Sequence, residues 1–279
     1  NIGFAPTDKT TIGYKLELLG VSAYNGGFVA DINNTNSANG HPIYAIGSTL
    51  IYNNVVGAPF DRNREWDASG VGTAGVTPGY PYNVLIKGNS KVDIGINTTS
   101  GIDNRAIAND LTIEAGSALD MNVMDQTGHH LTVGRDITFA GSLILGRGTT
   151  VNNPYVGDIL VGRNWTRTGA TSIFNPNETG TGYTAANTQT VISNVTSNIK
   201  ARAVTFFGTD ASIIKAPRNT VRDINGVFGG ETFPYLKLNK ANTSNTLTND
   251  TSSIAITREL FLVKGTLNLG DSNIVIVSN

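Results

Sequence analysis

The chain contains 279 residues with a formal net charge of -1, and only 15% of them are charged, so it offers no basic surface for phosphate contacts and nucleic acid is not an expected partner. It contains no cysteine, which excludes disulfides, thiolate catalysis and cysteine-based zinc sites. Apolar residues make up 39% but stand in short runs, none near the roughly 18 residues that a membrane-spanning helix requires, so we expect no insertion into a membrane.

Residues 1–56 form a first β-rich part of the chain in our interpretation. The clearest strand-like runs are YKLELLGVSAY at 14–24 and STLIYNNVV at 48–56. Between them, the polar stretch DINNTNSANGHP at 31–42 is rich in turn-forming residues, which indicates an excursion from the strands. We expect early strands here, with a less regular spacing than later in the chain.

Residues 57–82 interrupt the strand-like pattern. The segment GAPFDRNREWDASGVGTAGVTPGYPY is rich in Gly, Pro and charge, which favours a loop that leaves the body of the fold. A second polar, turn-forming stretch lies at 174–190. Loops inserted into a repetitive β-structure tend to gather on one face, where binding usually takes place, so both are candidate contact surfaces.

Aromatic residues in or beside these loops are the candidate contacts to a glycan or another partner: Trp66, Tyr80, Tyr82 and Tyr183. Aromatic faces stack on sugar rings and provide amphipathic contact area. The alternative is that these rings cover the ends of strands or pack under the loops, as Trp and Tyr often do. For Trp165, in GRNWTRTG, we prefer this structural role.

The densest group of charged residues surrounds Trp66 and consists of Asp61, Arg62, Arg64, Glu65 and Asp67. Two carboxylates and an arginine in one groove would suit a polysaccharide lyase or hydrolase. The carboxylates crowd one loop, however, and do not recur from strand to strand. We therefore expect a solvated corner in which the indole ring caps apolar surface.

Residues 83–279 carry the most regular pattern. In HLTVGRDITFAGSLILGRG at 130–148, apolar pairs mark strands with one buried face; they are Leu131/Val133, Ile137/Phe139 and Leu143/Leu145. The pattern returns in SIAITRELFLVKGTLNLGDSNIVIVSN at 253–279 as Ile254/Ile256, Leu260/Leu262, Leu267/Leu269 and Ile274/Ile276. Further candidate strands lie at 84–86, 92–94, 111–113, 119–121, 159–161, 204–206 and 235–238.

These strands restart every six or seven residues, closer than the spacing of about 8–12 residues between turns in sandwiches and barrels. The spacing favours an all-β solenoid, a right-handed parallel β-helix with short strands and inserted loops. We read IDNRAIAND at 102–110 as a loop or a single turn because it is too short for an independent helix. The last residues have no polar cap, so we expect the body of 83–279 to continue beyond them.

No motif predicts a catalytic, cofactor-binding or metal-binding residue. The histidines are His41, His129 and His130, and neighbours in a strand point to opposite faces, so the adjacent pair with Asp125 nearby is a poor metal site. The chain has no Gly-x-Ser-x-Gly nucleophile elbow, and GTAGVTPG lacks the Lys-Ser/Thr of a phosphate loop.

Five segments together resemble a known family: REWDASGVGTAGVTPGYPYNVLIKGNSKVDIG, NDLTIEAGSALDMN, GDILVGRNWTRTG, AVTFFGTDASI and FPYLKLNKANTSNTL. Their order is similar to the β-helical repeat region of very large Bacteroidota surface and secreted proteins, which use the type IX secretion route and include gliding-motility adhesins. The resemblance covers about residues 47–279, and it implies an extracellular location and a shaft, filament or adhesin role. It carries over no catalytic residue.

We therefore expect a non-enzymatic, extracellular structural or adhesive segment without cofactors, secreted or held at the cell surface. Its expected partners are surface glycans or other copies of the same protein. Two alternatives remain open at this point: a polysaccharide lyase or hydrolase on the same scaffold, and a dedicated glycan-binding module.

Overall fold

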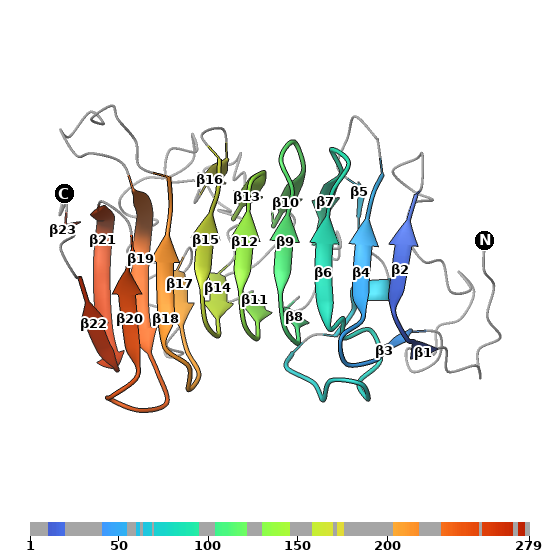
Figure 1. Ribbon diagram of the computed structural model, residues 1–279, viewed down its shortest axis with the longest axis horizontal. Coiled ribbons are helices and arrows are strands. Elements are labelled where there is room, and N and C mark those ends of the chain that lie inside the picture. The colour runs from blue at the N-terminus through green and yellow to red at the C-terminus, as the bar shows by residue number, and fades with distance from the viewer. Residues whose placement is uncertain are drawn as a thin grey trace, which may run out of the picture.

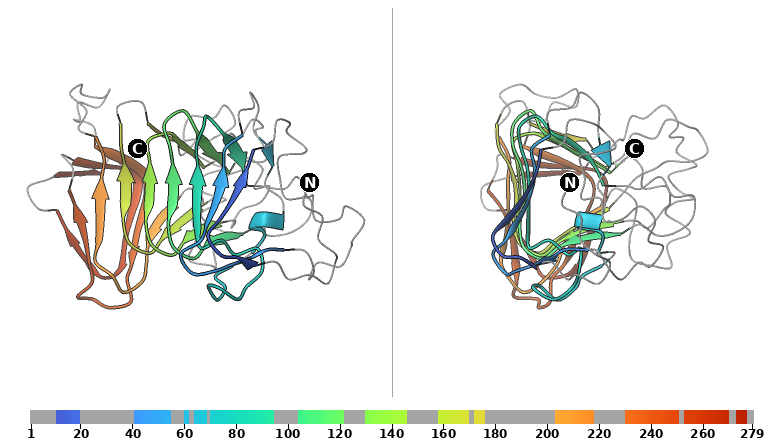
Figure 2. Two further views of the ribbon diagram at one scale, coloured as in Figure 1. Left: turned by 45° about the vertical axis from the view of Figure 1, so that its right-hand side comes forward. Right: turned by 90° about the vertical axis from the view of Figure 1, so that its right-hand side faces the viewer.

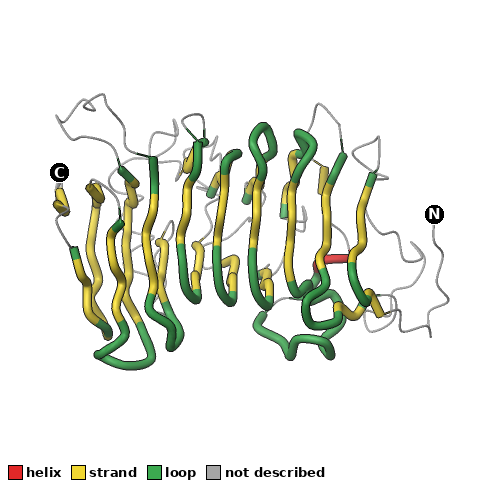
Figure 3. Tube along the Cα trace, viewed as in Figure 1, coloured by secondary structure: helices red, strands yellow, loops and turns green. Residues whose placement is uncertain are grey.

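The computed structural model describes residues 11–19, 41–54, 60–61, 64–68, 70–94, 104–121, 130–145, 158–169, 172–175, 203–217, 230–250, 253–269 and 273–276. Strands account for nearly all regular structure in these ranges, and one 3-10 turn, η1 (Arg64–Trp66), is the exception (Figure 3). The prediction of an all-β chain is confirmed. No helix in the described ranges has the length and apolar character needed to cross a membrane.

Three large sheets organise the described strands, and every strand pair in them is parallel (Figure 1). The nine-stranded sheet contains, in order, β2 (Lys15–Leu18), β4 (Thr49–Tyr52), β6 (Asn83–Ile86), β9 (Leu111–Ile113), β12 (Ile137–Phe139), β15 (Trp165–Arg167), β18 (Ser212–Lys215), β20 (Thr246–Asn249) and β22 (Thr266–Asn268). The seven-stranded sheet contains β8 (Arg105–Ile107), β11 (His130–Val133), β14 (Asp158–Val161), β17 (Ala203–Phe206), β19 (Glu231–Asn239), β21 (Ser253–Lys264) and β23 (Asn273–Ile276). The five-stranded sheet contains β5 (Phe60–Asp61), β7 (Lys91–Asp93), β10 (Ala118–Asp120), β13 (Ser142–Ile144) and β16 (Ile173–Asn175). A small two-stranded sheet pairs β1 (Thr11–Ile12) with β3 (Ile43–Tyr44).

The chain visits the three large sheets in rotation. From β6 to β18 it passes from the nine-stranded to the five-stranded to the seven-stranded sheet and back, and we call one such passage a circuit. After β18, the described strands alternate between the nine-stranded and the seven-stranded sheets. β2 pairs with β4, and β4 pairs with β6, so the first β-rich part of the chain continues into the same sheet.

The alternating pattern of the sequence produces a common interior. One hydrophobic cluster contains inward residues of all three sheets, which face one another when the molecule is viewed along the row of strands (Figure 2). The register places similar side chains on adjacent strands beside one another. Leu131 lies beside Ile159, and Ile159 lies beside Val204, and each is fully buried. Complete burial of such a side chain stabilises the fold by about 1.5–3 kcal/mol. The predicted inward pairs of 130–148 are all buried, as expected.

The predicted short spacing of strands is wrong near the C-terminal end. Ile254 and Leu260 were assigned to separate strands, but both lie on the twelve-residue strand β21. The residues between them, Ala-Ile-Thr-Arg-Glu, include no Gly or Pro that would turn the chain. The assignment of 102–110 as a loop is also wrong, because it contains β8. Within 57–82, β5 pairs with β7, so part of this expected loop belongs to a sheet.

Glycine allows successive circuits to approach closely where the chain turns from the seven-stranded into the nine-stranded sheet. A Cβ atom on Gly134 would lie 2.1 Å from the carbonyl oxygen of Ala108, and one on Gly162 would lie 1.9 Å from that of Gly134. Real Cβ atoms do not come so close to backbone, so these two corners require glycine.

A buried lysine closes a later corner of the same kind. Lys240 follows β19, and its ammonium group donates to the carbonyl oxygens of Gly162 at 3.0 Å and Phe207 at 2.7 Å, and to Oγ of Ser212 at 2.5 Å. Burial lowers the pKa of Lys240 to about 8. The side chain therefore supplies donors to carbonyl groups that lie away from water.

A buried ion pair lies among the aromatic residues of the interior. Oε2 of Glu231 accepts hydrogen bonds from Trp165 Nε1 at 2.9 Å and Arg167 Nε at 3.0 Å. Burial raises the pKa of Glu231, and the charge of Arg167 acts in the opposite direction. Trp165 also packs edge-on against Phe139, with ring centroids 5.3 Å apart. The predicted structural role of Trp165 is confirmed.

Candidate functional site

An open pocket lies at the end of the molecule where β1 to β4 begin the fold. Its volume is about 560 Å³, within the range of about 300–1,000 Å³ for small-molecule sites. The lining residues come from the segment before β3 and from the segment between η1 and β6: His41, Asp67, Ala68, Gly70, Val71, Gly72, Thr77 and Pro78. This second segment extends past the lower ends of the strands in Figure 1.

Backbone hydrogen bonds close the loop that forms the pocket. The N–H groups of Asp67 and Ala68 both donate to the carbonyl oxygen of Gly79 at 3.0 Å. The N–H of Gly79 donates in turn to the carbonyl of Pro42 at 2.8 Å. Thr77 accepts from the N–H of Thr73 at 2.8 Å through Oγ1, which folds the tip of the loop on itself. The two segments of the lining are therefore held together by main-chain contacts.

Asp67 is the polar centre of the lining. Its Oδ2 lies 3.0 Å from Nε2 of His41, and its Oδ1 lies 3.4 Å from Nη2 of Arg105. Arg105 is the first residue of β8 and stands in register with Leu131, at a position that faces the interior. The guanidinium group is buried and approaches the carboxylate from behind. A cation and an imidazole thus hold the carboxylate from two sides.

Two residues before Asp67 in the chain, Glu65 is the centre of a buried polar cluster. The hydroxyl of Tyr52 donates to Oε1 of Glu65 at 2.9 Å, and the hydroxyl of Tyr44 donates to the Glu65 carbonyl at 2.8 Å. Burial and the neighbouring carboxylate raise the pKa of Tyr44 well above its ordinary value. The prediction of a solvated corner is wrong for Glu65, because tyrosine hydroxyls replace water around it. The side chains of Asp61, Arg62 and Arg64 lie outside the description.

Trp66 and Tyr80 do not present their rings to a ligand. Trp66 is 0% exposed and donates from Nε1 to the carbonyl of Ala106 at 3.0 Å. Tyr80 is 4% exposed, and burial raises its pKa. The burial of both rings agrees with the alternative, in which they pack under the loop, and gives no support to a glycan contact. Tyr82 is half-buried, and Tyr183 lies outside the described residues.

Aliphatic residues are the exposed apolar groups around the pocket, and the sequence patterns did not single them out. Val71, which lines the pocket, is 70% exposed, and Val76 on the same loop is 63% exposed. Ile46, also 70% exposed, lies next to this loop, because a Cβ on Gly75 would be 3.8 Å from its Cγ1. This apolar surface is therefore built from two segments, one that carries Ile46 and one that carries Val71 and Val76.

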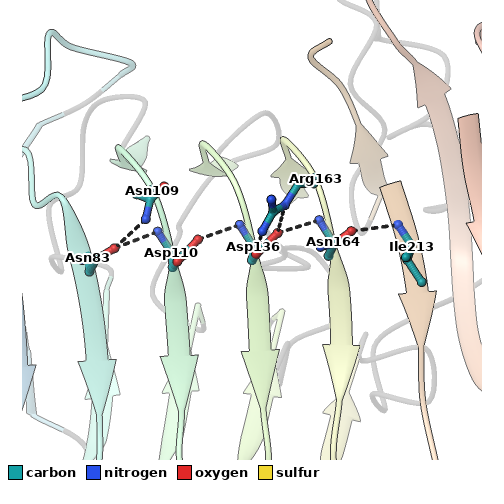
Figure 4. A network of polar contacts seen from close by, with 7 residues as sticks. All are labelled: Asn83, Asn109, Asp110, Asp136, Arg163, Asn164 and Ile213. Atoms are coloured by element: carbon teal, nitrogen blue, oxygen red, sulfur yellow. Dashed lines mark hydrogen bonds and ion pairs between the residues drawn. The ribbon is translucent and has the colours of Figure 1, made fainter. Parts of the chain in front are cut away.

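A ladder of polar side chains forms a second cluster, where the chain enters the nine-stranded sheet (Figure 4). Oδ1 of Asp110 accepts from the N–H of Asp136 at 3.2 Å, and Oδ1 of Asp136 accepts from the N–H of Asn164 at 3.1 Å. Asn164 repeats the contact with the N–H of Ile213 at 3.0 Å. Each side chain thus caps the backbone of the following strand of this sheet.

Two carboxylates of this ladder, Asp110 and Asp136, stand at equivalent positions just before the neighbouring strands β9 and β12, a recurrence that the sequence patterns did not single out. Burial raises the pKa of Asp110. Burial acts in the same direction on Asp136, but hydrogen bonds from Arg163, with Nε at 2.7 Å, and from backbone lower its pKa below the ordinary value. Two neighbouring carboxylates therefore have pKa values shifted in opposite directions.

No group of three or more metal-ligating side chains occurs among the residues that the structure describes. Asp125 and His129 lie outside them, and the N–H of His130 donates to Oδ1 of Asn104 at 3.0 Å. The prediction of a poor metal site at this pair therefore stays a prediction. No protein-family model, curated protein or solved structure matches the chain.

Proposed function

We propose that the chain is a right-handed parallel β-helix and serves as a non-enzymatic structural or adhesive segment, the shaft of an extracellular surface adhesin or filament. The observation that carries this proposal is the in-register parallel pairing that runs from β2 to β22 through the nine-stranded sheet. The rotation of the chain through three sheets and the resemblance to large Bacteroidota surface proteins support the same assignment.

Continuous pairing suits a load-bearing shaft. Each inner strand of the nine-stranded sheet is hydrogen-bonded on both sides, and the interior is one unbroken cluster. At about 4.8 Å per strand, the sheet spans about 38 Å from β2 to β22. In a solenoid each circuit contacts only its neighbours, so damage to one circuit lowers stability locally and leaves the rest of the stack paired.

Single-molecule stretching tests the mechanical part of the proposal. The chain has no cysteine, so Tyr14→Cys and Leu262→Cys, both at exposed positions, give two unique handles near opposite ends of the row. We expect stepwise unfolding in which each step releases about one circuit of residues. A single low-force event that releases the whole chain would contradict a shaft, and the same handles in a Gly162→Ala background provide the weakened control.

A polysaccharide lyase or hydrolase is the second candidate function, and the alignment of Asp110 with Asp136 beside Arg163 favours it. The same contacts weigh against it, because these carboxylate oxygens already accept backbone and guanidinium hydrogen bonds. Incubation with acidic polysaccharides distinguishes the two functions. Turnover that disappears in Asp136→Asn would establish an enzyme, and the shaft proposal expects none.

A further inference from the structure

We infer that the pocket around Asp67 binds a neutral sugar residue of a glycan. This inference rests on the adhesive part of the proposed function and names a binding site within it. The site uses none of the aromatic residues that the sequence indicated. Three features of the pocket lining support this inference: the balance of its charges, its mixture of polar and apolar surface, and its rigidity.

The charge balance excludes a strongly charged ligand. Asp67 contributes the carboxylate of the lining, and Arg105 neutralises it from behind at 3.4 Å. An anionic ligand would face the exposed side of this carboxylate, while a cation would compete with the guanidinium that already holds it. Hydroxyl groups avoid both the repulsion by the carboxylate and the competition with the guanidinium, because they donate to carboxylate oxygens without carrying charge. Asp67 is suited to accept them, since its side chain keeps 32% of its surface exposed.

The lining also offers the apolar surface that a sugar ring needs. Val71 and Pro78 contribute apolar surface to the lining, and Thr77 adds a hydroxyl. A pyranose presents C–H groups on its faces and hydroxyls around its edge, so it matches a site with both kinds of surface. Gly70 and Gly72 carry no side chains that would narrow the opening.

The polar centre is preorganised. Nε2 of His41 and Nη2 of Arg105 lie 3.0 and 3.4 Å from the two carboxylate oxygens, and Trp66 next to Asp67 is anchored to the backbone of β8 at 3.0 Å. A site that needs little ordering loses less free energy on binding. Weak ligands such as single sugars depend on this saving.

The test is binding of neutral oligosaccharides of gluco, galacto and manno configuration to the full chain, by calorimetry or an array, beside their uronic-acid and sialylated counterparts. We expect saturable binding of a neutral member, weakened about tenfold or more by Val71→Asp or Asp67→Asn. Val76→Asp is the matched control, because Val76 is similarly exposed on the same loop but is not among the lining residues. Unchanged thermal unfolding shows that each variant is folded.

Three results overturn the inference: no neutral sugar binding up to about 10 mM, preference for acidic glycans, or binding that Val71→Asp and Asp67→Asn leave unchanged. In the last case the chain is adhesive through another surface. Stretching measures the shaft independently of any sugar, so failure of the pocket and failure of the proposed function give different results.

Discussion

Replacement of Lys240 by methionine tests whether the buried ammonium group holds its corner together. Methionine keeps the length and apolar stem of the side chain but removes the three donated hydrogen bonds to Gly162, Phe207 and Ser212. Each acceptor left unpaired costs about 1–3 kcal/mol, and removal of a buried charge offsets part of this. We therefore expect a net loss of about 2–4 kcal/mol in the free energy of unfolding.

The pH dependence gives a second readout for the same variant. The pKa of Lys240 is lowered in the folded chain to about 8, below its ordinary value of 10.5. Between these two pH values the unfolded chain binds more protons, so the contribution of this group to stability rises with pH. The destabilisation caused by Lys240→Met should consequently grow as the pH is raised from about 8 to 10.

Urea denaturation followed by circular dichroism measures both effects. Lys215→Met is the control, since Lys215 is exposed and its 3.7 Å pair with Asp250 contributes about 0–1 kcal/mol. A loss below about 0.5 kcal/mol for Lys240→Met, or one equal to that of the control, would refute the structural role of the ammonium group.

Three further variants test the corners, the buried ion pair and the polar ladder by chemical denaturation. Gly162→Ala should destabilise by more than about 2 kcal/mol, because its Cβ would lie 1.9 Å from a carbonyl oxygen, whereas Gly13→Ala, with open space around it, should be neutral. Arg167→Met should lower the free energy of unfolding by about 3–5 kcal/mol at pH 7. The loss should become smaller toward pH 4.5, because the raised pKa of Glu231 lets that carboxylate take up a proton. A loss that does not depend on pH would contradict this. Asp136→Ala should cost about 1–2 kcal/mol and Asp136→Asn less, because the amide keeps the accepting oxygen.

Local periodicity sufficed to predict the strands whose inward positions are all aliphatic. Leu131 and Val133 point inward, and their neighbours in β14, Ile159 and Val161, are equally apolar, so the alternation reports burial directly. β8 escaped prediction because Arg105 occupies the inward position that Leu131 takes in the next strand. Its charge is balanced by Asp67, 38 positions earlier in the chain, and no local pattern shows such a pairing.

The candidate site was hidden for the same reason. His41, Asp67 and Arg105 belong to three separate segments, and only the stacking of the strands brings them together. The polar loop around Trp66 and Tyr80 left open whether the rings contact a partner or pack under the loop. The tertiary structure provides a backbone acceptor for the indole and buries both rings, which composition alone does not reveal.

The polar ladder also has a direction. In every one of its cross-strand contacts from Asn83 to Ile213, the side-chain oxygen belongs to the earlier residue and the N–H to the later one. The contacts of Asn104 with His130 have the same sense. A chain that folds from its N-terminal side therefore finds each acceptor already in place when the next strand arrives.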